Sequence, residues 1–359
     1  MRPNDPATWR PGCLDVEVTS ACNVGCRYCY LGRPRGDFMS RETADVVVRY
    51  LNAHNTPLVP AELNLYGGEP FLNFEIVQHL VASSNARATI FTNGASAEPW
   101  QIAWCIANGV RPKRSTAGCP EAAELTRPGG YTERWLAEGE LWQDHADARR
   151  LTVTPETAPC VRQSVLWLRG KGYKGSVDLA TDDYAAWPTG AQEAYSDQLA
   201  LLAKDCLDEV RAGRPVWVEN FSSFGRAIFA QSRVTIFGCG AGWNTWGVTW
   251  DGRIVPCHRF FREPGGSPFG GGALKMVLPG GVPRFGEVVV KAVDGWARGV
   301  ERVECLACSA RQCCSRGCLH VQRAAGGMPD HRCRFTRLYA GLARWINDES
   351  RIPRWWDAN

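Results

Sequence analysis

The sequence predicts an α/β protein: a partial (β/α)6 TIM-like barrel followed by a cysteine-rich C-terminal domain. In the N-terminal half, short β-prone runs alternate with helical patterns about six times, which implies parallel strands joined by right-handed crossovers. From Cys239 onward, closely spaced cysteines replace this pattern. The predicted boundaries are 1–212 for the barrel, 213–236 for a connecting region and 237–359 for the cysteine-rich domain.

Each predicted strand is a short run that ends at a turn or a polar motif. The strands are expected at 14–18, 62–66, 88–91, 110–113, 151–154 and 176–180. Helices are expected at 43–54, 98–108 and 192–210, with another beginning at Pro155. Because ligands of such barrels lie at the C-terminal ends of the strands, the loops that follow the strands should carry the site.

The loop after the first strand holds Cys22, Cys26 and Cys29, with Tyr28 just before the last cysteine. Thiolate is a soft ligand that favours zinc, copper(I) or iron–sulfur clusters. A closed structural zinc site uses four protein ligands, and this loop offers three. A four-iron cluster held by three cysteines leaves one iron free to bind a small molecule. A zinc loop completed by a distant cysteine is the alternative.

This C-x3-C-x2-C spacing, with an aromatic residue before the last cysteine, resembles the radical S-adenosylmethionine (SAM) enzymes. The resemblance implies that Cys22, Cys26 and Cys29 hold a [4Fe-4S] cluster whose open iron chelates SAM. It also implies reductive cleavage of SAM to methionine and a 5'-deoxyadenosyl radical, which abstracts hydrogen from the substrate. A reductant such as flavodoxin or ferredoxin would supply the electron.

Further loop residues resemble SAM-binding segments of the same family. The segment after the second strand matches the family's GGEP motif, which binds the SAM amino group; it consists of Gly67, Gly68, Glu69 and Pro70. Two glycines let the backbone approach a ligand closely, although such a segment alone is as often an ordinary turn. By the same resemblance, Tyr28 and Asn93 are assigned to cofactor binding.

Ser115 and Arg127 resemble the serine and arginine of the family segment S-x-D-G with a following arginine, which contact SAM. A guanidinium is the natural partner of the SAM carboxylate. The chain departs from the pattern, with Ala117 in place of the aspartate and Cys119 in place of a common proline. The alternative for Arg127 is a surface arginine in a turn. Thr181, after the sixth strand, is expected to contact adenosine through its backbone.

The C-terminal cysteines follow the pattern C-x12-G-x4-C, a gap, C-x2-C-x5-C-x3-C, a gap and a final cysteine. This pattern resembles the SPASM extension of peptide- and protein-modifying radical SAM enzymes. The resemblance implies two auxiliary [4Fe-4S] clusters, and so three clusters in all. One auxiliary cluster would be held by Cys305, Cys308, Cys314 and Cys333, a full thiolate set. The other would be held by Cys239, Cys257 and Cys318.

The ligand sets leave alternatives open. In the related sulfatase maturases a cysteine six residues after the first supplies a fourth ligand, and here Thr245 stands at that position. The cluster at Cys239 therefore has an open iron or recruits another residue such as Cys313. Cys313 also allows a register one residue away from Cys314, although the spacing to Cys318 favours Cys314. Two structural zinc sites are the alternative for the whole region.

His258 directly follows Cys257, at the position where sulfatase maturases carry an aspartate that acts as a base. A histidine there takes a proton near neutral pH, or it donates a hydrogen bond that supports the neighbouring cluster. The cysteines without ligand spacing are expected to be small buried hydrophobic residues; they are Cys13, Cys105, Cys119, Cys160 and Cys206. Most of the 15 tryptophans should lie in the core.

Composition excludes several classes of protein. A net charge of +4 and a pI near 8.3 are too mild to argue for nucleic-acid binding. No run approaches the about 20 apolar residues of a membrane span, and the first residues, Met1 to Pro6, have no apolar signal core. A soluble, cytoplasmic, metal-binding protein is expected.

The sequence as a whole predicts a radical SAM/SPASM enzyme that modifies a ribosomally made peptide. The modification would be a crosslink, a thioether or another net two-electron oxidation, with the auxiliary clusters taking the remaining electron. Because the first strand begins near residue 14, recognition of a leader peptide would need a separate protein or the barrel itself. Formylglycine formation on a sulfatase is the alternative reaction, disfavoured by Thr245 and His258. A non-catalytic zinc or electron-transfer protein is the alternative of another class.

Overall fold

The structure is a computed structural model. It describes residues 12–32, 34–54, 61–127, 129–142, 148–173, 175–230, 239–242, 244–263 and 303–357. Residues 231–238 and 264–302 fall in the predicted connecting and cysteine-rich regions and lie outside the described residues.

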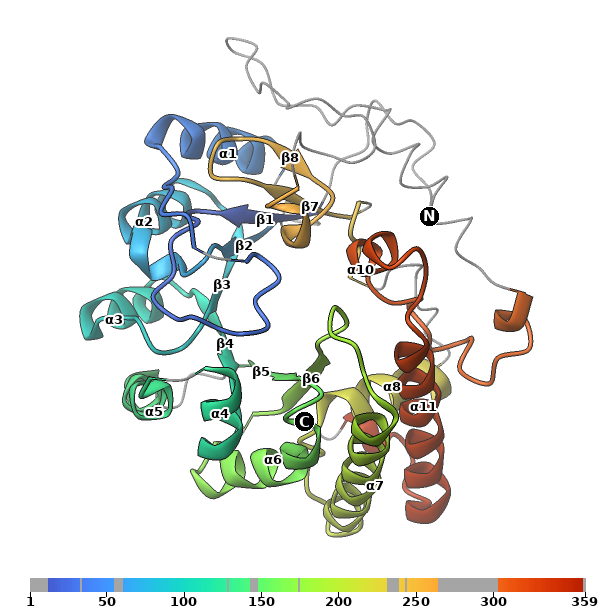
Figure 1. The fold of residues 1–359 in the computed structure, drawn as a ribbon. Helices are drawn as coiled ribbons and strands as arrows, with labels where there is room; N and C mark the ends of the chain where they lie inside the picture. The colour runs from blue at the N-terminus through green and yellow to red at the C-terminus, as the bar shows by residue number, and fades with distance from the viewer. Residues whose placement is uncertain are drawn as a thin grey trace.

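Eight strands of the described chain form one curved sheet in the order β6-β5-β4-β3-β2-β1-β7-β8 (Figure 1). The strands are β1 (Cys13–Glu17), β2 (Glu62–Tyr66), β3 (Arg87–Thr92), β4 (Arg111–Thr116), β5 (Ala148–Val153), β6 (Val177–Thr181), β7 (Thr245–Val248) and β8 (Ile254–Val255). All neighbours pair in parallel except β7 and β8. The predicted six-stranded partial barrel is confirmed.

The addition of β7 to β1 was not predicted. β7 comes from the cysteine-rich region, yet Cys13 pairs with Thr245 and Val16 with Val248 in the same parallel register. The β7–β8 hairpin therefore continues the barrel's own sheet. The segment after β8 contacts the cysteine loop after β1, since the His258 ring lies 5.9 Å from the Tyr30 ring and the Arg259 guanidinium lies 4.7 Å from it.

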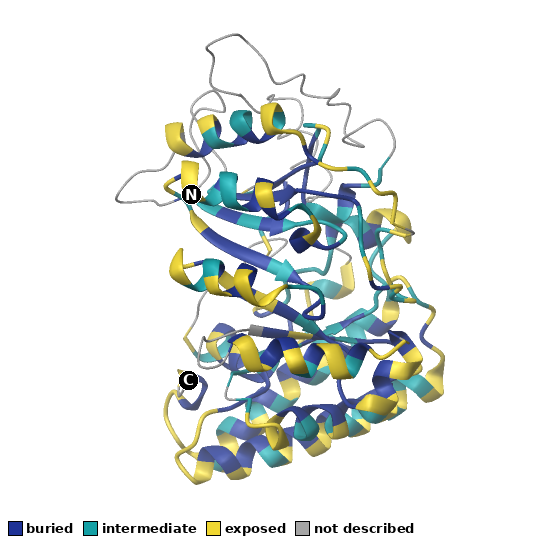
Figure 2. Cartoon of the chain, turned by 90° about the vertical axis from the view of Figure 1, so that its left-hand side faces the viewer, coloured by how far each residue is buried: buried dark blue, intermediate teal, exposed yellow. Residues whose placement is uncertain are grey.

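Helices surround the sheet, most of them on its outer face (Figure 1). They are α1 (Arg41–His54), α2 (Phe74–Ser83), α3 (Pro99–Ala107), α4 (Pro120–Thr126), α5 (Tyr131–Trp142), α6 (Val161–Gly170), α7 (Thr189–Arg211), α8 (Glu219–Phe229), α10 (Leu319–Ala324) and α11 (Asp330–Ser350). Short 3-10 helices are η1 (Pro70–Asn73), η2 (Ala158–Cys160), η3 (His258–Phe260), η4 (Val303–Cys305) and η5 (Trp355–Asp357). In Figure 2 these helices are buried on the side that faces the sheet and exposed on the other.

Most predicted strand and helix ends differ from the observed ones by one to three residues, and two differences change the local structure. The helix expected from Pro155 is a turn followed by η2 and α6, because Thr154 and Thr157 bond to each other's backbone and hold residues 154–157 in a turn. Ser115, expected in the loop after the fourth strand, lies inside β4 and pairs with Arg150 of β5.

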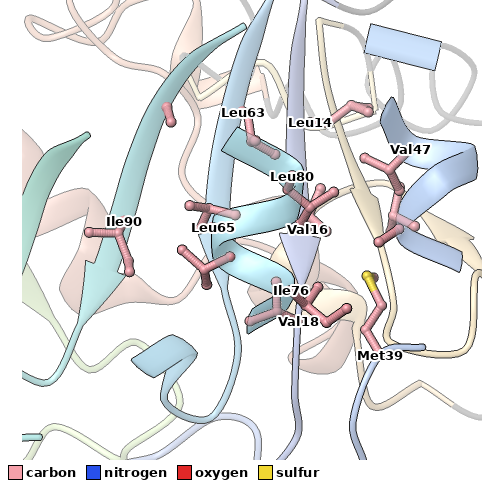
Figure 3. Close-up of a cluster of buried hydrophobic side chains, with 14 of the residues drawn as sticks. Leu14, Val16, Val18, Met39, Val47, Leu63, Leu65, Ile76, Leu80 and Ile90 are labelled. Atoms are coloured by element: carbon pink, nitrogen blue, oxygen red, sulfur yellow. The ribbon is translucent and has the colours of Figure 1, made fainter. Parts of the chain in front are cut away.

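The two faces of β1 have different partners. Leu14 and Val16 point toward α1 and α2, where they pack with side chains such as Val47 and Leu80 (Figure 3). Because side chains alternate along a strand, Asp15 and Glu17 lie on the opposite face and are also buried. The apolar face anchors the strand, while the acidic face points into the barrel.

The sheet ends at β6 because its outer edge is already occupied. Val177 N donates to Trp217 O at 2.8 Å. The Asn220 side chain accepts from Leu179 N at 2.8 Å and donates to Leu179 O at 3.0 Å. These bonds satisfy backbone groups that would otherwise pair with a further strand. The barrel therefore stays open between β6 and β8.

The C-terminal helix α11 packs against α7 and α8. Tyr339 and Tyr195 join their hydroxyls at 2.7 Å, and Phe335 meets the Tyr195 ring edge-on at 4.7 Å. α11 also reaches the barrel, since the Arg332 guanidinium donates to Thr181 Oγ1 at 3.0 Å.

Most predictions of burial hold. Cys13, Cys105, Cys119 and Cys206 are buried, and Trp246, Trp355 and Trp356 belong to the core. Cys160 is the exception and is only half-buried, because it sits at the exposed end of η2. No helix among the described residues is both long and apolar enough to span a bilayer.

Glu138 of α5 is a buried carboxylate that ties α5 to the loop after β3 and to β4. It accepts from Ser96 N at 2.7 Å and Ala97 N at 3.0 Å, and it lies 3.7 Å from Arg114 Nε. Both charged side chains are almost inaccessible, at 4% and 0% exposure. Removing one partner of such a pair leaves a buried charge without its counterion.

We predict that Glu138→Ala lowers the free energy of unfolding by about 3–5 kcal/mol. The matched control is Glu140→Ala on the exposed side of the same helix, where a change within about 0.5 kcal/mol is expected. Urea unfolding followed by circular dichroism measures both. Equal midpoints for the two variants would contradict the assigned role of Glu138.

Candidate functional site

The three-cysteine loop after β1 is clamped at its base. Ser20 N donates to Asp37 O at 2.8 Å, and Asp37 N donates to Ser20 Oγ at 2.8 Å. Farther along, Arg27 N donates to Thr126 O at 3.0 Å, which fixes the loop to α4. Cys22 and Cys26 are half-buried and Cys29 is exposed. The loop thus presents its thiols from a fixed backbone.

Gly67 and Gly68 let the loop after β2 lie directly against the cysteine loop. A Cβ on Gly67 would come within 2.6 Å of Thr19 O, and one on Gly68 within 2.2 Å of Ala21 O. Gly68 N donates to Thr19 O at 2.8 Å, which continues the β1–β2 ladder. The sequence indicated close approach to a ligand, whereas these contacts show close approach between two backbones.

Glu69 is completely buried at the end of this segment. It accepts from Asn93 N at 2.7 Å and from Thr92 Oγ1 at 2.9 Å. Burial, the largest cause, raises the pKa of Glu69 to about 8 against the lowering effect of these bonds. A positive or hydrogen-donating ligand group nearby would favour the charged form.

These loops open into a cavity of about 480 Å³ at the C-terminal ends of the strands. Most of the predicted site residues line it: Cys22, Cys26, Tyr28, Cys29, Gly67, Gly68, Asn93, Ser115, Arg127, Thr181 and His258. Glu69 and Pro70 do not line it, since they turn into the packed interior behind the loop. The structure therefore brings together in one place residues that the sequence spreads over more than half its length.

Arg127 is a buried cation at the wall of this cavity, not a surface turn residue, with 4% of its surface exposed. Its Nε donates to Tyr28 Oη at 2.6 Å, and another nitrogen donates to Tyr131 Oη. Burial raises the pKa of Tyr28 to about 12, so its hydroxyl is neutral. Among the described residues no carboxylate forms an ion pair with Arg127. Its charge is left for an anionic ligand.

The other predicted ligand set differs in exposure from one thiol to the next, since Cys257 is buried, Cys318 is half-buried and Cys239 is exposed. Burial raises the pKa of the Cys257 thiol, and the charges of the Cys318 and Cys239 thiols raise it further. Thr245 offers no sulfur here, and its hydroxyl donates to Cys239 O at 3.0 Å.

The remaining four cysteines of the predicted ligand sets line a second cavity of about 330 Å³; they are Cys305, Cys308, Cys314 and Cys333. Cys313 is separate from it, since its Sγ donates to Ala310 O at 3.3 Å within a small apolar cluster that includes Ala340. This arrangement favours Cys314 over Cys313 as the ligand.

The cavity suits a group larger than one metal ion. Zinc–sulfur bonds of about 2.3 Å draw four thiols closely together. Among the described residues no three Cys, His, Asp or Glu side chains are close enough to hold a single ion. Four thiols spaced around a cavity fit an iron–sulfur cubane, whose irons each take one thiolate.

His258 is fixed in orientation by Asp15. Its Nδ1 lies 2.8 Å from Asp15 Oδ2, and its backbone N donates to the same oxygen at 3.2 Å. The ring stacks on Tyr66 with centroids 4.4 Å apart. Asn64 Nδ2 donates to Asp15 Oδ1 at 2.9 Å and holds the carboxylate in turn. Since Nδ1 faces Asp15, Nε2 is the ring nitrogen left for other chemistry.

Several residues of this site were missed in the sequence. The sequence around Asp15 does contain a pattern that could have indicated a site residue, because an acidic side chain stands between Leu14 and Val16 in an otherwise apolar strand. No such pattern marks Tyr131 and Tyr184, since only the fold places their rings beside Arg127 and at the cavity wall.

Comparisons with known proteins agree with this geometry. A family model described as a 4Fe-4S single cluster domain matches residues 11–98. An uncharacterised protein of Methanocaldococcus jannaschii is 34% identical over 73 residues, which is 20% of this chain. The chain spans about a quarter of that relative's length, 24%.

Solved structures are similar over most of the chain. Native anSMEcpe, an anaerobic sulfatase maturating enzyme with bound AdoMet, has a TM-score of 0.76 at 16% identity, covering 94% of this chain and 99% of that one. Its complex with the Cp18Cys peptide gives the same score, with 94% and 98% covered. Streptococcus suis SuiB bound to its precursor peptide SuiA has a TM-score of 0.57 at 14% identity, covering 88% and 74%. The chain therefore has the fold of the radical SAM/SPASM enzymes, as its cysteine spacing predicts.

Proposed function

We propose that this protein is a radical SAM maturase that oxidises a residue of a peptide. The observation that carries the proposal is the cavity in which three loop thiols and a buried, unneutralised arginine face one space. Cys22, Cys26 and Cys29 supply the soft ligands of a [4Fe-4S] cluster with one open iron. When bound, that cluster and SAM supply a 5'-deoxyadenosyl radical that abstracts hydrogen from the substrate.

The residues of the cavity would bind and orient SAM. Arg127 pairs with its carboxylate, because a desolvated guanidinium without a counterion favours an anion strongly. Ser115 lines the same wall, and the Tyr131 hydroxyl, which donates to Ser115 O at 2.9 Å, fixes its backbone. Glu69 does not line the cavity, but it accepts a hydrogen bond from Asn93 N and so fixes Asn93. The Asn93 side chain in turn donates to Asn23 Oδ1 of the cysteine loop at 3.0 Å.

The two outer thiol groups support the auxiliary clusters. Cys305, Cys308, Cys314 and Cys333 surround a cavity and form a complete set for one [4Fe-4S] cluster. Cys239, Cys257 and Cys318 form the second set. Clusters there would accept the electron that a two-electron oxidation leaves on the substrate.

His258 is proposed to take a proton from the substrate. Asp15 fixes Nδ1, and the ring borders the cavity. No described cysteine Sγ accepts a hydrogen bond from the ring, so a role in supporting the cluster has less geometric support than a role as base.

A peptide is the proposed substrate, because similar structures were solved with peptides: Cp18Cys in anSMEcpe and SuiA in SuiB. Formylglycine formation on a sulfatase is the second candidate, favoured by the TM-score of 0.76 to anSMEcpe. His258 and Thr245 stand where sulfatase maturases carry an aspartate and a cysteine, and we therefore rank it second.

Anaerobic reconstitution with iron and sulfide tests the proposal. We expect about twelve irons per chain, four for each cluster, and formation of 5'-deoxyadenosine from SAM when dithionite is added. Bound zinc, or iron without 5'-deoxyadenosine, would instead identify a non-catalytic zinc or electron-transfer protein.

Cys314→Ala is expected to lower the iron content by as much as about four per chain, because one cubane loses a ligand. The neighbouring variant Cys313→Ala is the matched control and should keep all its iron, since that thiol packs into an apolar cluster. Iron analysis and EPR spectra of the reduced variants measure the difference. Loss of iron from the Cys313 variant alone would reverse the ligand assignment.

Arg127→Gln is expected to weaken SAM binding by about 10- to 100-fold, the value of a hydrogen bond to a charged group. The control is Arg27→Gln, which removes an exposed arginine from the same cavity and should change affinity by less than about threefold. Equilibrium binding to reconstituted protein with unchanged iron content measures both. Equal SAM affinity of the Arg127 variant and the native chain would contradict the proposed contact between Arg127 and the SAM carboxylate.

His258→Asn is expected to leave 5'-deoxyadenosine formation intact and to reduce modified peptide by about 100-fold or more, because general-base catalysis contributes that much. Asp15→Asn should reduce it less, since it disturbs only the orientation of the ring. Mass spectrometry of a peptide coexpressed from a neighbouring gene measures the product. An altered auxiliary-cluster EPR spectrum with normal product would assign His258 to cluster support.

A further inference from the structure

The auxiliary cluster assigned to Cys239, Cys257 and Cys318 has three thiols, one fewer than a cubane with a thiolate on each iron requires. Cys313 is badly placed to supply the fourth, because its thiol packs into a separate small apolar cluster. The fold brings a different buried thiol to this ligand set. Cys13 begins β1, and 8% of its surface is exposed.

Thr245, at the start of β7, lies next to three cysteines. Cys13 is its partner in the parallel β1–β7 ladder. Its hydroxyl donates to Cys239 O at 3.0 Å. On its other side, the antiparallel register of β7 and β8, continued by two residues, places Cys257 opposite Thr245. Cys257 is still extended there, with φ −170° and ψ 177°.

The side chains of Cys13, Thr245 and Cys257 face the same side of the sheet, because residues in register on neighbouring strands point the same way. That side is the barrel interior, where Asp15, on the same face of β1 as Cys13, accepts from His258 N at 3.2 Å. Strands lie about 4.8 Å apart, so the backbones of Cys13 and Cys257 are separated by roughly 10 Å, with Thr245 between them.

The third thiol of the set reaches the same region from α10 (Figure 1). Cys318 immediately precedes α10. The first residues of that helix pack on the segment around Cys257, since the His320 ring meets the Phe260 ring edge-on at 4.6 Å. Leu319 belongs to the same buried cluster as Cys257. Four thiols thus approach one region from β1, β8, α10 and the turn before β7.

The hydrogen bond to Cys13 has the direction that a thiolate ligand needs. Asn64 Nδ2 donates to Asp15 Oδ1 at 2.9 Å, which fixes the orientation of the amide, since a carboxylate accepts and does not donate. The same nitrogen donates to Cys13 Sγ at 3.1 Å. A thiol sulfur is a weak acceptor, whereas hydrogen bonds to the cysteine sulfurs tune iron–sulfur clusters. The sulfur of Cys13 is therefore presented with a donor, as a ligand sulfur would be.

We infer that Cys13 is the fourth ligand of the cluster held by Cys239, Cys257 and Cys318, which lies over the small Thr245 side chain. The inference rests on the proposed function, from which it takes the cluster. Ligation replaces the thiol proton with an Fe–S bond and releases that proton to solvent. With four thiolates the cluster has no open iron for a substrate group, so its role is electron transfer.

Selenocysteine at position 13 of the full chain, Cys13→Sec, tests the ligand directly. After anaerobic reconstitution, selenium X-ray absorption spectra are expected to show iron as a direct neighbour of selenium. The matched control is Cys105→Sec, because Cys105 is fully buried inside α3, and its selenium should have no iron neighbour. Selenium without an iron neighbour at position 13, in protein with its full iron content, would overturn the inference.

Cys13→Ala is expected to lower the iron content by as much as about four per chain and to alter the EPR spectrum of one auxiliary cluster. Cys105→Ala should change neither. Unchanged iron content and unchanged spectra in Cys13→Ala would show that the cluster does not use this sulfur.

These measurements are independent of SAM cleavage. A chain that forms no 5'-deoxyadenosine but shows selenium bound to iron at position 13 would contradict the proposed function and support the role of Cys13. A chain that cleaves SAM but shows no iron beside that selenium would support the proposed function and contradict the role of Cys13.

Discussion

The parallel pairing of β1 with both β2 and β7 is the constraint on which the site depends. Through β2 it sets the cysteine loop against Gly67 and Gly68, where no side chain fits between the backbones. Through β7 it places the β7–β8 hairpin beside β1, so that the residues after Cys257 reach the inward face of β1. The inward face of β1 adds two buried acids, Asp15 and Glu17, which hold His258 and Arg262 across the junction. One strand thus links the proposed radical-generating loop to the proposed auxiliary-cluster region.

Much of the fold could be predicted from the sequence because it depends on local patterns. The strand at Glu62–Tyr66 was predicted to the residue, since an alternating run ends at two glycines. The six-unit barrel followed from the alternation of strands and helices. The extra strand β7 could not be predicted, because its pairing with β1 joins residues about 230 positions apart, and no local signal specifies a contact at that separation.

The candidate site was likewise predicted only in part from the sequence. Cysteine spacing located the thiol groups, and the structure gathers Cys305, Cys308, Cys314 and Cys333 around one cavity. The spacing of residues could not predict which charged side chains would be buried and which would have an ion-pair partner. Arg127 looks like an ordinary arginine in the sequence, and only the fold shows that tyrosine rings enclose it without a paired carboxylate in the described chain. A desolvated cation without a counterion is costly, and an anionic ligand offsets that cost.

The central claim is that the Cys22, Cys26 and Cys29 cluster has an open iron that binds SAM directly. Electron–nuclear double resonance on the reduced, reconstituted protein with isotope-labelled SAM tests it most directly. The account predicts hyperfine coupling of the cluster to both the amino nitrogen and the carboxylate of SAM. A reduced cluster whose spectrum shows no coupling to either labelled group at saturating SAM would contradict it.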